Sequence, residues 1–191
     1  MKYADGKVAG VLFFVAASQF VIGMMIAEAR GISGYSISTN YISDLGVGPS
    51  AMIFNSSVFL LGLLVLVGAY FLQRAFKFKL LTVLLVLTAI GAMGVGVFTE
   101  DWGWVHPVVS LIAFLFSGLS CIASYRLVKR PFSVIVVILG LMTLGALGLF
   151  SADVYLGLGA GGMERMIVYP VLTWGAGFGG YLLASSDKAR L

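Results

Sequence analysis

Charged residues are scarce in this chain of 191 residues: Lys, Arg, Asp and Glu make up 10% of it, and apolar residues make up 60%. A soluble globular domain has about 25% charged residues, so the composition excludes that class. The formal net charge is +4, but the basic residues occur as small groups between apolar runs rather than as one basic patch. We therefore expect no nucleic-acid partner.

Cysteine and histidine are just as rare, with one residue each, Cys121 and His106. A single cysteine excludes an intramolecular disulfide. Catalytic zinc sites are built from several His, Cys or carboxylate ligands, and the zinc hydrolases of membranes usually carry more than one His. The sequence thus predicts no metal centre, and no motif in it indicates a cofactor.

Long apolar runs are what the sequence has in abundance. Each is about 19–22 residues long, the length that an α-helix needs to cross a hydrocarbon core. No Lys, Arg, Asp or Glu lies near the middle of any run. We predict an all-α, polytopic integral membrane protein that forms a single domain over residues 1–191. Its six transmembrane helices are expected at residues 8–27, 51–72, 80–98, 105–125, 132–150 and 166–184.

The segments between the runs divide by charge. Ten of the twelve basic residues fall on one side of the predicted membrane, and six of the eight acidic residues fall on the other. Cytoplasmic loops carry the excess of Lys and Arg in membrane proteins. We therefore predict a multi-pass protein of the cell membrane with both termini in the cytoplasm. The residues that predict this side include Lys2, Arg74, Arg126, Lys188 and Arg190.

Small residues inside the runs predict close helix packing. Gly175 and Gly179 form a G-x-x-x-G pair in the last run, and such pairs let helix backbones approach closely in lipid. Packing within one chain is the favoured interpretation, and a homo-oligomer through this Gly175/Gly179 face is the alternative. Gln19 lies near the middle of the first run, so we expect it to bond to a neighbouring helix.

Polar residues collect at the outer ends of all six runs, which predicts a shared outward-facing pocket. The candidates are Arg30, Ser43, Asp44, Asn55, Glu100, Asp101, His106, Asp153, Glu164 and Arg165. Helix capping is the structural alternative for Ser50, Asp101 and Glu164, which precede predicted helices. The glycine-rich segment at residues 157–162 is expected to form a flexible or re-entrant cover over the pocket.

The order of these outer residues resembles the domain-of-unknown-function 998 family of archaeal and bacterial membrane proteins. The resemblance is carried by Ser43-Asp44-Leu45-Gly46, Phe54-Asn55, Phe98-Thr99-Glu100-Asp101 with His106, and Gly162-Met163-Glu164-Arg165. It covers nearly the whole chain and implies six spans but no particular reaction. In span count and outline the family is also similar to the Frag1/DRAM/Sfk1 group of eukaryotic membrane proteins.

Three functions are compatible with this pocket. In the leading one it binds a membrane lipid headgroup or a small anion. Arg165 and Arg30 would then supply charge-assisted hydrogen bonds, with Ser43, Asn55, Asp101, Asp153 and Glu164 as further ligand contacts. In the second, an outer-leaflet hydrolase or group transferase uses His106 with Glu100 or Asp44 as acid and base. In the third, the protein is a non-catalytic membrane scaffold.

Two local expectations follow from the cost of burying polar groups unpaired. Arg165 should form an ion pair with an acid from another outer segment, most plausibly Asp44 or Glu100. The His106 ring should face the bundle interior and bond to a polar group from the second or third span, with Asn55, Ser56, Thr99 and Glu100 as candidates.

Overall fold

The structure is a computed structural model that describes residues 2–31 and 34–185. Lys188 and Arg190, which were predicted to be cytoplasmic, lie outside the described residues. The described part is all-helical, without a strand, and its six long helices are each apolar enough to cross a membrane. They are α1 (Lys2–Arg30), α2 (Ala51–Phe76), α3 (Lys79–Val97), α4 (Val105–Ala123), α5 (Phe132–Ser151) and α6 (Gly159–Ser185). The predicted six-span fold is confirmed.

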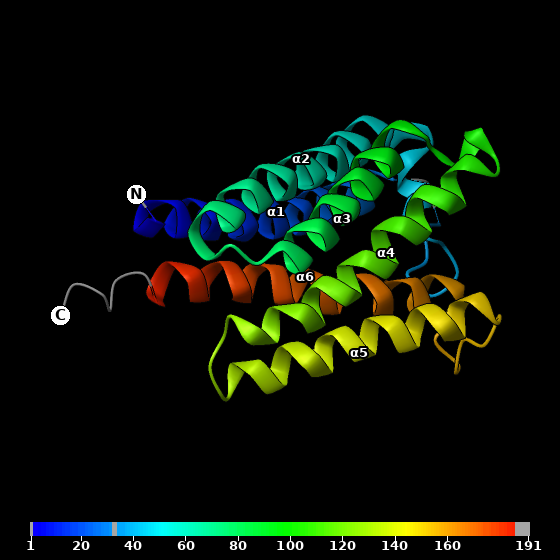
Figure 1. Ribbon diagram of the computed structural model, residues 1–191. Coiled ribbons are helices and arrows are strands. Elements are labelled where there is room, and N and C mark those ends of the chain that lie inside the picture. The colour runs from blue at the N-terminus through cyan, green and yellow to red at the C-terminus, as the bar shows by residue number, and fades with distance from the viewer. Residues whose placement is uncertain (1, 32–33, 186–191) are drawn as a thin grey trace.

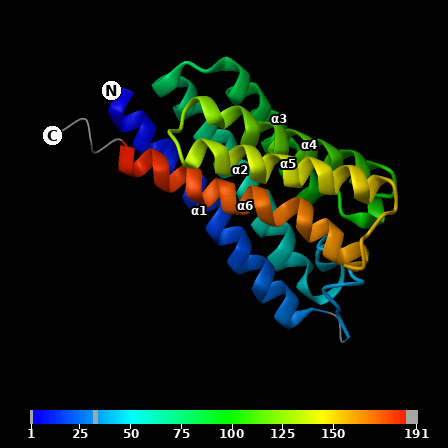
Figure 2. The same ribbon diagram turned by 90° about the horizontal axis from the view of Figure 1, so that it is seen from below.

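The helices pack in chain order around a common axis. Each long helix contacts the next one in the sequence, and α6 also contacts α1, so the circle closes. Figure 2 shows α6 running between α1 and α5. The short connections that join α2 to α3 and α4 to α5 make these pairs antiparallel neighbours, as loop length predicts.

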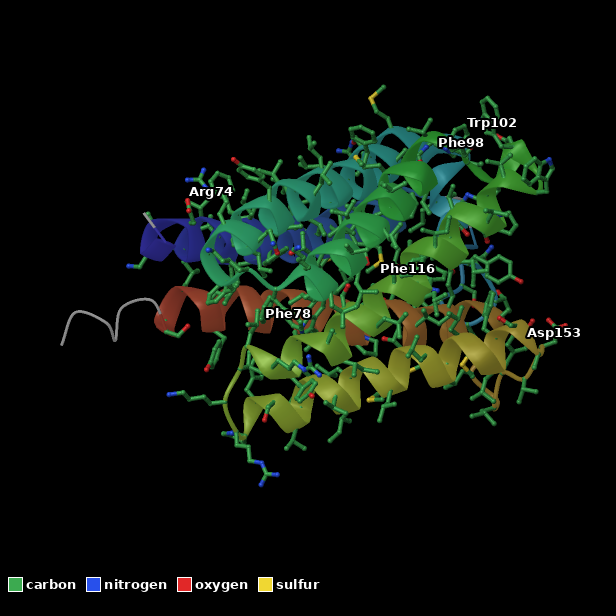
Figure 3. All side chains as sticks on the ribbon, viewed as in Figure 1. Arg74, Phe78, Phe98, Trp102, Phe116 and Asp153 are labelled. Atoms are coloured by element: carbon green, nitrogen blue, oxygen red, sulfur yellow. The ribbon has the colours of Figure 1, made fainter. Side chains whose placement is uncertain are left out.

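One end of the bundle carries the longer connections (Figure 1), and we call it the loop end. It holds residue 31 and residues 34–50, 98–104 and 152–158, with the short 3₁₀ helices η1 (Ser43–Gly46), η2 (Gly48–Ser50) and η3 (Glu100–Trp102). Phe98, Trp102 and Asp153 lie at this end in Figure 3. Arg74 lies at the opposite end, where α1 begins, and forms an ion pair of 3.2 Å with Asp5.

Glycines set the close approach of neighbouring helices. A Cβ at Gly179 would lie 2.5 Å from the backbone nitrogen of Phe14 and 2.6 Å from the carbonyl oxygen of Gly10. A Cβ at Gly175 would lie 3.3 Å from that of Ala17. The Gly175/Gly179 face is therefore covered by α1 of the same chain, which is the intramolecular arrangement favoured above.

The long polar side chain inside α1 is also satisfied by a neighbouring helix. Gln19 donates from Nε2 to the carbonyl oxygen of Ser57 in α2 at 3.0 Å and to that of Ala16 in α1 at 3.1 Å. An unpaired side-chain amide in the hydrocarbon region would cost roughly a few kcal/mol. This contact confirms the expectation that Gln19 bonds to a second helix.

The prediction that residues 157–162 form a flexible or re-entrant segment is wrong for most of this segment. Helix α6 begins at Gly159, seven residues before the predicted start at 166. The carbonyl oxygen of Ser38 accepts hydrogen bonds from the backbone N–H groups of Gly161 and Gly162. A Cβ at Gly161 would collide with the backbone of Asn40. Glycine is used here so that the preceding loop can lie directly on the first turn of α6.

Candidate functional site

A cavity of about 330 Å³ opens at the loop end. It is enclosed by the segment 41–43, the connection between α3 and α4, and the facing parts of α4, α5 and α6. Its walls are formed by Tyr41, Ser43, Glu100, Gly103, His106, Pro107, Ser110, Phe114, Phe150 and Glu164. We call this the loop-end cavity. Four of the ten residues predicted for the pocket line it, and two of those four are acids.

Glu100 joins two loops across the mouth of the cavity. The hydroxyl of Ser43 donates to its Oε1 at 2.6 Å. Burial raises the pKa of Glu100 above its ordinary value, and the nearby carboxylate of Asp44 raises it further, whereas the Ser43 hydroxyl and His106 act in the opposite direction. A carboxyl group with a raised pKa can serve as a proton donor nearer to neutral pH than an ordinary glutamate.

His106 faces the interior, as predicted, and is 8% exposed. Its Nδ1 lies 2.7 Å from the carbonyl oxygen of Phe98, at the end of α3. A carbonyl oxygen only accepts hydrogen bonds, so Nδ1 carries a proton. Nε2 then remains as the acceptor of the neutral ring, and the hydroxyl of Ser110 lies 3.3 Å from it. The Phe98 carbonyl belongs to the predicted third span, so a bond to that span is present. The candidate side chains Asn55, Ser56, Thr99 and Glu100 are wrong, because the second ring nitrogen lies beside Ser110, one turn along α4.

Glu164 closes the inner wall of the cavity. It lies inside α6 rather than before it, and it is 6% exposed. Its Oε2 accepts a hydrogen bond from the backbone N–H of Ile42, which fixes the segment before η1. The capping role predicted for Glu164 is therefore wrong: the carboxylate satisfies a loop amide, while the first turn of α6 is satisfied by Ser38.

Arg165 is buried behind this wall and does not line the cavity. Its Nη1 lies 3.0 Å from each of the carbonyl oxygens of Ile37, Asn40 and Gly161. Its Nη2 donates to Glu28 at 2.9 Å and to the hydroxyl of Tyr35 at 2.6 Å. The expected buried ion pair exists, but its partner is Glu28 rather than Asp44 or Glu100. Arg165 thus ties residues 35–40 to the end of α1 and the start of α6.

Tyr35 completes this anchor. Its hydroxyl accepts from Arg165 and donates to the carbonyl oxygen of Tyr41 at 2.9 Å. Burial raises the pKa of Tyr35 to about 12, although the guanidinium opposes this shift. The tyrosine therefore remains a neutral donor at physiological pH. We call Glu28, Tyr35 and Arg165 the arginine clamp.

The other predicted site residues lie apart from the cavity. Asp44 accepts from Asn40 and from the backbone of Tyr41, so it shapes the turn before η1. Asn55 donates to the carbonyl oxygen of Gly46 at 2.9 Å. Arg30 and Asp101 are exposed. Asp153 is also exposed and accepts from the hydroxyl of Tyr155 at 2.8 Å.

Several residues of the cavity were not predicted. Ser110 was the most accessible to sequence reasoning, because a residue four positions after His106 shares its helix face. Tyr41, Phe114 and Phe150 carried no comparable signal, since aromatic residues are common in membrane spans and at their ends. The predicted cap Ser50 instead donates to the carbonyl oxygen of Leu45 at 3.1 Å. Within the described residues, no group of three His, Cys, Asp or Glu side chains is placed to hold a metal ion.

Comparison with known proteins adds a family but no activity. Searches of curated proteins and of solved structures return no significant match. One family model, DUF998, described as a protein of unknown function, matches residues 8–180. The match spans all four motifs from which the resemblance was inferred and includes all six helices in whole or in large part. The chain belongs to the DUF998 family.

Proposed function

We propose that this protein binds the polar head of a membrane lipid in the loop-end cavity, and that this head is neutral or cationic and carries hydroxyl or amine groups. The observation that carries the proposal is the convergence of two carboxylates, one imidazole and two serine hydroxyls on one cavity next to the hydrocarbon region. Carboxylate oxygens accept hydrogen bonds, and two in one site favour a ligand that donates them.

A small anion fits the same cavity poorly. Arg165, which follows Glu164 in α6, is buried behind the wall, and its two terminal nitrogens are bonded to Glu28, Tyr35 and three carbonyl groups. Arg30 is exposed at the end of α1. An anion would therefore face Glu100 and Glu164 in a wall to which the described residues contribute no Lys or Arg, and like charges at short range repel strongly in a partly buried site.

The orientation proposed for the protein places this cavity at the outer surface of the cell membrane. The basis is the distribution of basic residues, most of which belong to the end opposite the loop end. By the positive-inside rule that opposite end is cytoplasmic. The lipid head would then come from the outer leaflet, where the loop-end cavity lies level with the headgroups.

Three amphiphiles with one chain length test the proposed head chemistry. A long-chain amine, a monoacylglycerol and a fatty acid differ mainly in whether the head is cationic, neutral or anionic. Native mass spectrometry of the purified protein should show the amine and the monoacylglycerol bound more tightly than the fatty acid at neutral pH. Tightest binding of the fatty acid would overturn the proposed head chemistry in favour of an anion site.

A matched pair of acid substitutions localises the site. Glu100→Gln removes a charge from the cavity wall and should weaken binding of the amine at least about tenfold, the loss expected for a charge-assisted hydrogen bond in a partly buried site. Asp101→Asn removes the neighbouring exposed charge and should leave binding unchanged. Equal effects of the two substitutions would indicate a diffuse electrostatic attraction rather than this cavity.

A second candidate function is hydrolysis of a lipid ester, which is favoured by the pairing of His106 with Ser110. The Phe98 carbonyl holds the proton on Nδ1, so that Nε2 can accept the Ser110 proton while Oγ attacks an ester carbonyl. The imidazolium would return that proton to the departing alcohol, and water would release the acyl group from Ser110. In this candidate the lipid is a substrate rather than a held ligand.

Turnover of the bound monoacylglycerol decides between holding and hydrolysis. The hydrolase candidate predicts release of fatty acid and glycerol by the wild-type protein. That release should be lost in both Ser110→Ala and His106→Ala, while the long-chain amine still binds to Ser110→Ala. Absence of fatty acid release by a wild-type protein that binds the monoacylglycerol would exclude hydrolysis of this ester.

A further inference from the structure

Two smaller cavities continue from the loop-end cavity toward the middle of the bundle. The first, of about 90 Å³, shares Ser43, Ser110, Phe114 and Glu164 with it, so the two spaces adjoin. We call it the central cavity. The second, of about 70 Å³, adjoins the central cavity along Ala92, Ser117 and Leu172. We call it the lower cavity. The three spaces thus lie one after another along the bundle, and we call this row the path; residues of α1, α2, α3, α4 and α6 line its central and lower parts.

The length of this path follows from the number of residues along helix α6. Glu164 faces the loop-end and central cavities, and Phe178 lines the lower one. Fourteen helical residues separate them, which corresponds to about 21 Å at 1.5 Å per residue. That distance is a large part of a hydrocarbon core about 30 Å thick. The path thus begins at the polar mouth and ends deep within the level of the lipid chains.

The walls of the central and lower cavities are almost entirely apolar below Glu164. Apart from Ser43 and Ser110, which these walls share with the loop-end cavity, two hydroxyl groups remain, and both are turned to their own helices. Thr88 donates to the carbonyl oxygen of Leu84 at 2.9 Å, and Ser117 donates to that of Phe114 at 3.0 Å. None of the described residues that line the lower cavity is a Lys, Arg, Asp or Glu. A polar ligand or a hydrated ion would lose its hydrogen bonds to water there without gaining others from the walls, whereas a hydrocarbon chain has no such hydrogen bonds to lose.

We infer that the central and lower cavities hold the hydrocarbon chain of the amphiphile whose polar head binds in the loop-end cavity. This inference rests on the proposed function and specifies its ligand class: a lipid with a hydroxyl- or amine-bearing head and a chain that enters the bundle. The head stays among Ser43, Glu100 and His106. The chain runs inward past Ala92 and reaches Trp174, one of the residues that line the lower cavity.

Trp174 provides a direct reporter for this chain. It is 5% exposed and lines the lower cavity, so lipid or detergent around the bundle does not reach it. The other two tryptophans, Trp102 and Trp104, are exposed at the loop end, and the variant W102F/W104F leaves Trp174 as the only tryptophan. Bromine quenches tryptophan fluorescence at contact range. A monoacylglycerol brominated near the end of its chain should therefore quench Trp174 as it binds, and unbrominated monoacylglycerol should reverse the quenching.

Two substitutions on α3 separate the chain site from the membrane around the protein. Ala92→Phe fills the central cavity, and Ile90→Phe adds the same ring to an exposed position on the same helix. Ala92→Phe should abolish the quenching and lower the affinity for a long-chain monoacylglycerol at least tenfold, while a short-chain analogue binds as before. Ile90→Phe should change neither the quenching of Trp174 nor the affinity for the long-chain monoacylglycerol. Ala92→Leu gives a smaller obstruction that should have an intermediate effect.

The result that overturns the inference is distinct from failure of the proposed function. Suppose that both monoacylglycerols bind, that Glu100→Gln weakens this binding, and that the brominated chain does not quench Trp174 at saturation. The head site would then be real, and the chain would lie outside the bundle. Binding of neither analogue would remove the proposed function itself. The quenching test uses only exposed-residue substitutions, so it decides the question even if Ala92→Phe does not fold.

Discussion

At the scale of single residues, the charged residues of the loop end fall into two groups, one that anchors the loop and one that lines the cavity. Arg165 and Glu28 hold the loop in place, at a distance of 2.9 Å, and take no part in the cavity wall. Glu100, Glu164 and His106 line that wall. The charges were all visible in the sequence, but their pairing was not, because it depends on which loop folds over which helix.

The arginine clamp predicts a large loss of stability when its guanidinium is removed. Arg165→Gln leaves the half-buried Glu28 carboxylate and the loop carbonyl groups of Ile37 and Asn40 without their donor, and breaking such a pair costs about 3 kcal/mol. Arg30→Gln removes an exposed guanidinium from the same end of the bundle and should cost almost nothing. Thermal unfolding of the purified variants measures both. Similar melting temperatures for the two variants would show that the clamp does not hold the fold.

Glu100 predicts a pH-dependent stability. Its pKa is raised in the folded protein, so folding is favoured with the proton bound, and this contribution is fully present below the ordinary value of 4.5. It is lost as the pH rises through the higher folded pKa. Glu100→Gln should therefore match the wild type near pH 4 and melt at a higher temperature at pH 7. A variant that is less stable at pH 7 would contradict this direction.

At the scale of elements, four helix starts were predictable and two were not. The starts of α2, α3, α4 and α5 lie within one residue of the positions at which the apolar runs begin. Helix α1 begins earlier because its polar first residues continue the helix beyond the apolar run. Helix α6 begins at Gly159 because the Ser38 carbonyl satisfies its first amides, a contact between segments that no local pattern indicates.

Neighbouring glycines on α6 should differ sharply in tolerance. Gly179→Ala places a methyl group against the backbone of α1, and such overpacking costs about 1–3 kcal/mol. Gly180 has no atom within 4 Å of the added Cβ, so Gly180→Ala should be neutral or stabilise the helix by up to about 1 kcal/mol. Melting temperatures in detergent give the comparison. Equal behaviour of the two variants would contradict the close α1–α6 contact.

At the scale of the whole molecule, the helices are arranged in the order of the chain, so each connection joins two helices that are in contact. The sequence indicated this arrangement through short connections and small residues. It did not indicate the path through the middle, because Phe20, Ala92 and Phe114 look the same in sequence whether they fill a core or line a cavity. The cavity walls are a property of six helices together.

The orientation of the whole molecule is testable with almost no background, because the single native cysteine, Cys121, is buried. Lys77 lies in the connection between α2 and α3, Asp101 lies in η3 at the loop end, and both are exposed. In intact cells an impermeant thiol reagent should label Asp101→Cys and spare Lys77→Cys. The reverse pattern would place the loop end in the cytoplasm and move the proposed lipid site to the inner leaflet.

The central claim is that the loop-end cavity holds the head of a lipid, and photoaffinity labelling tests it most directly. A monoacylglycerol with a diazirine next to its head, crosslinked to the purified protein and mapped by mass spectrometry, should label Ser43, Ser110 and their neighbours in the cavity wall. Excess unlabelled monoacylglycerol should suppress that labelling. Crosslinks confined to lipid-facing positions such as Ile90 and Leu141, with none in the cavity wall, would contradict the account.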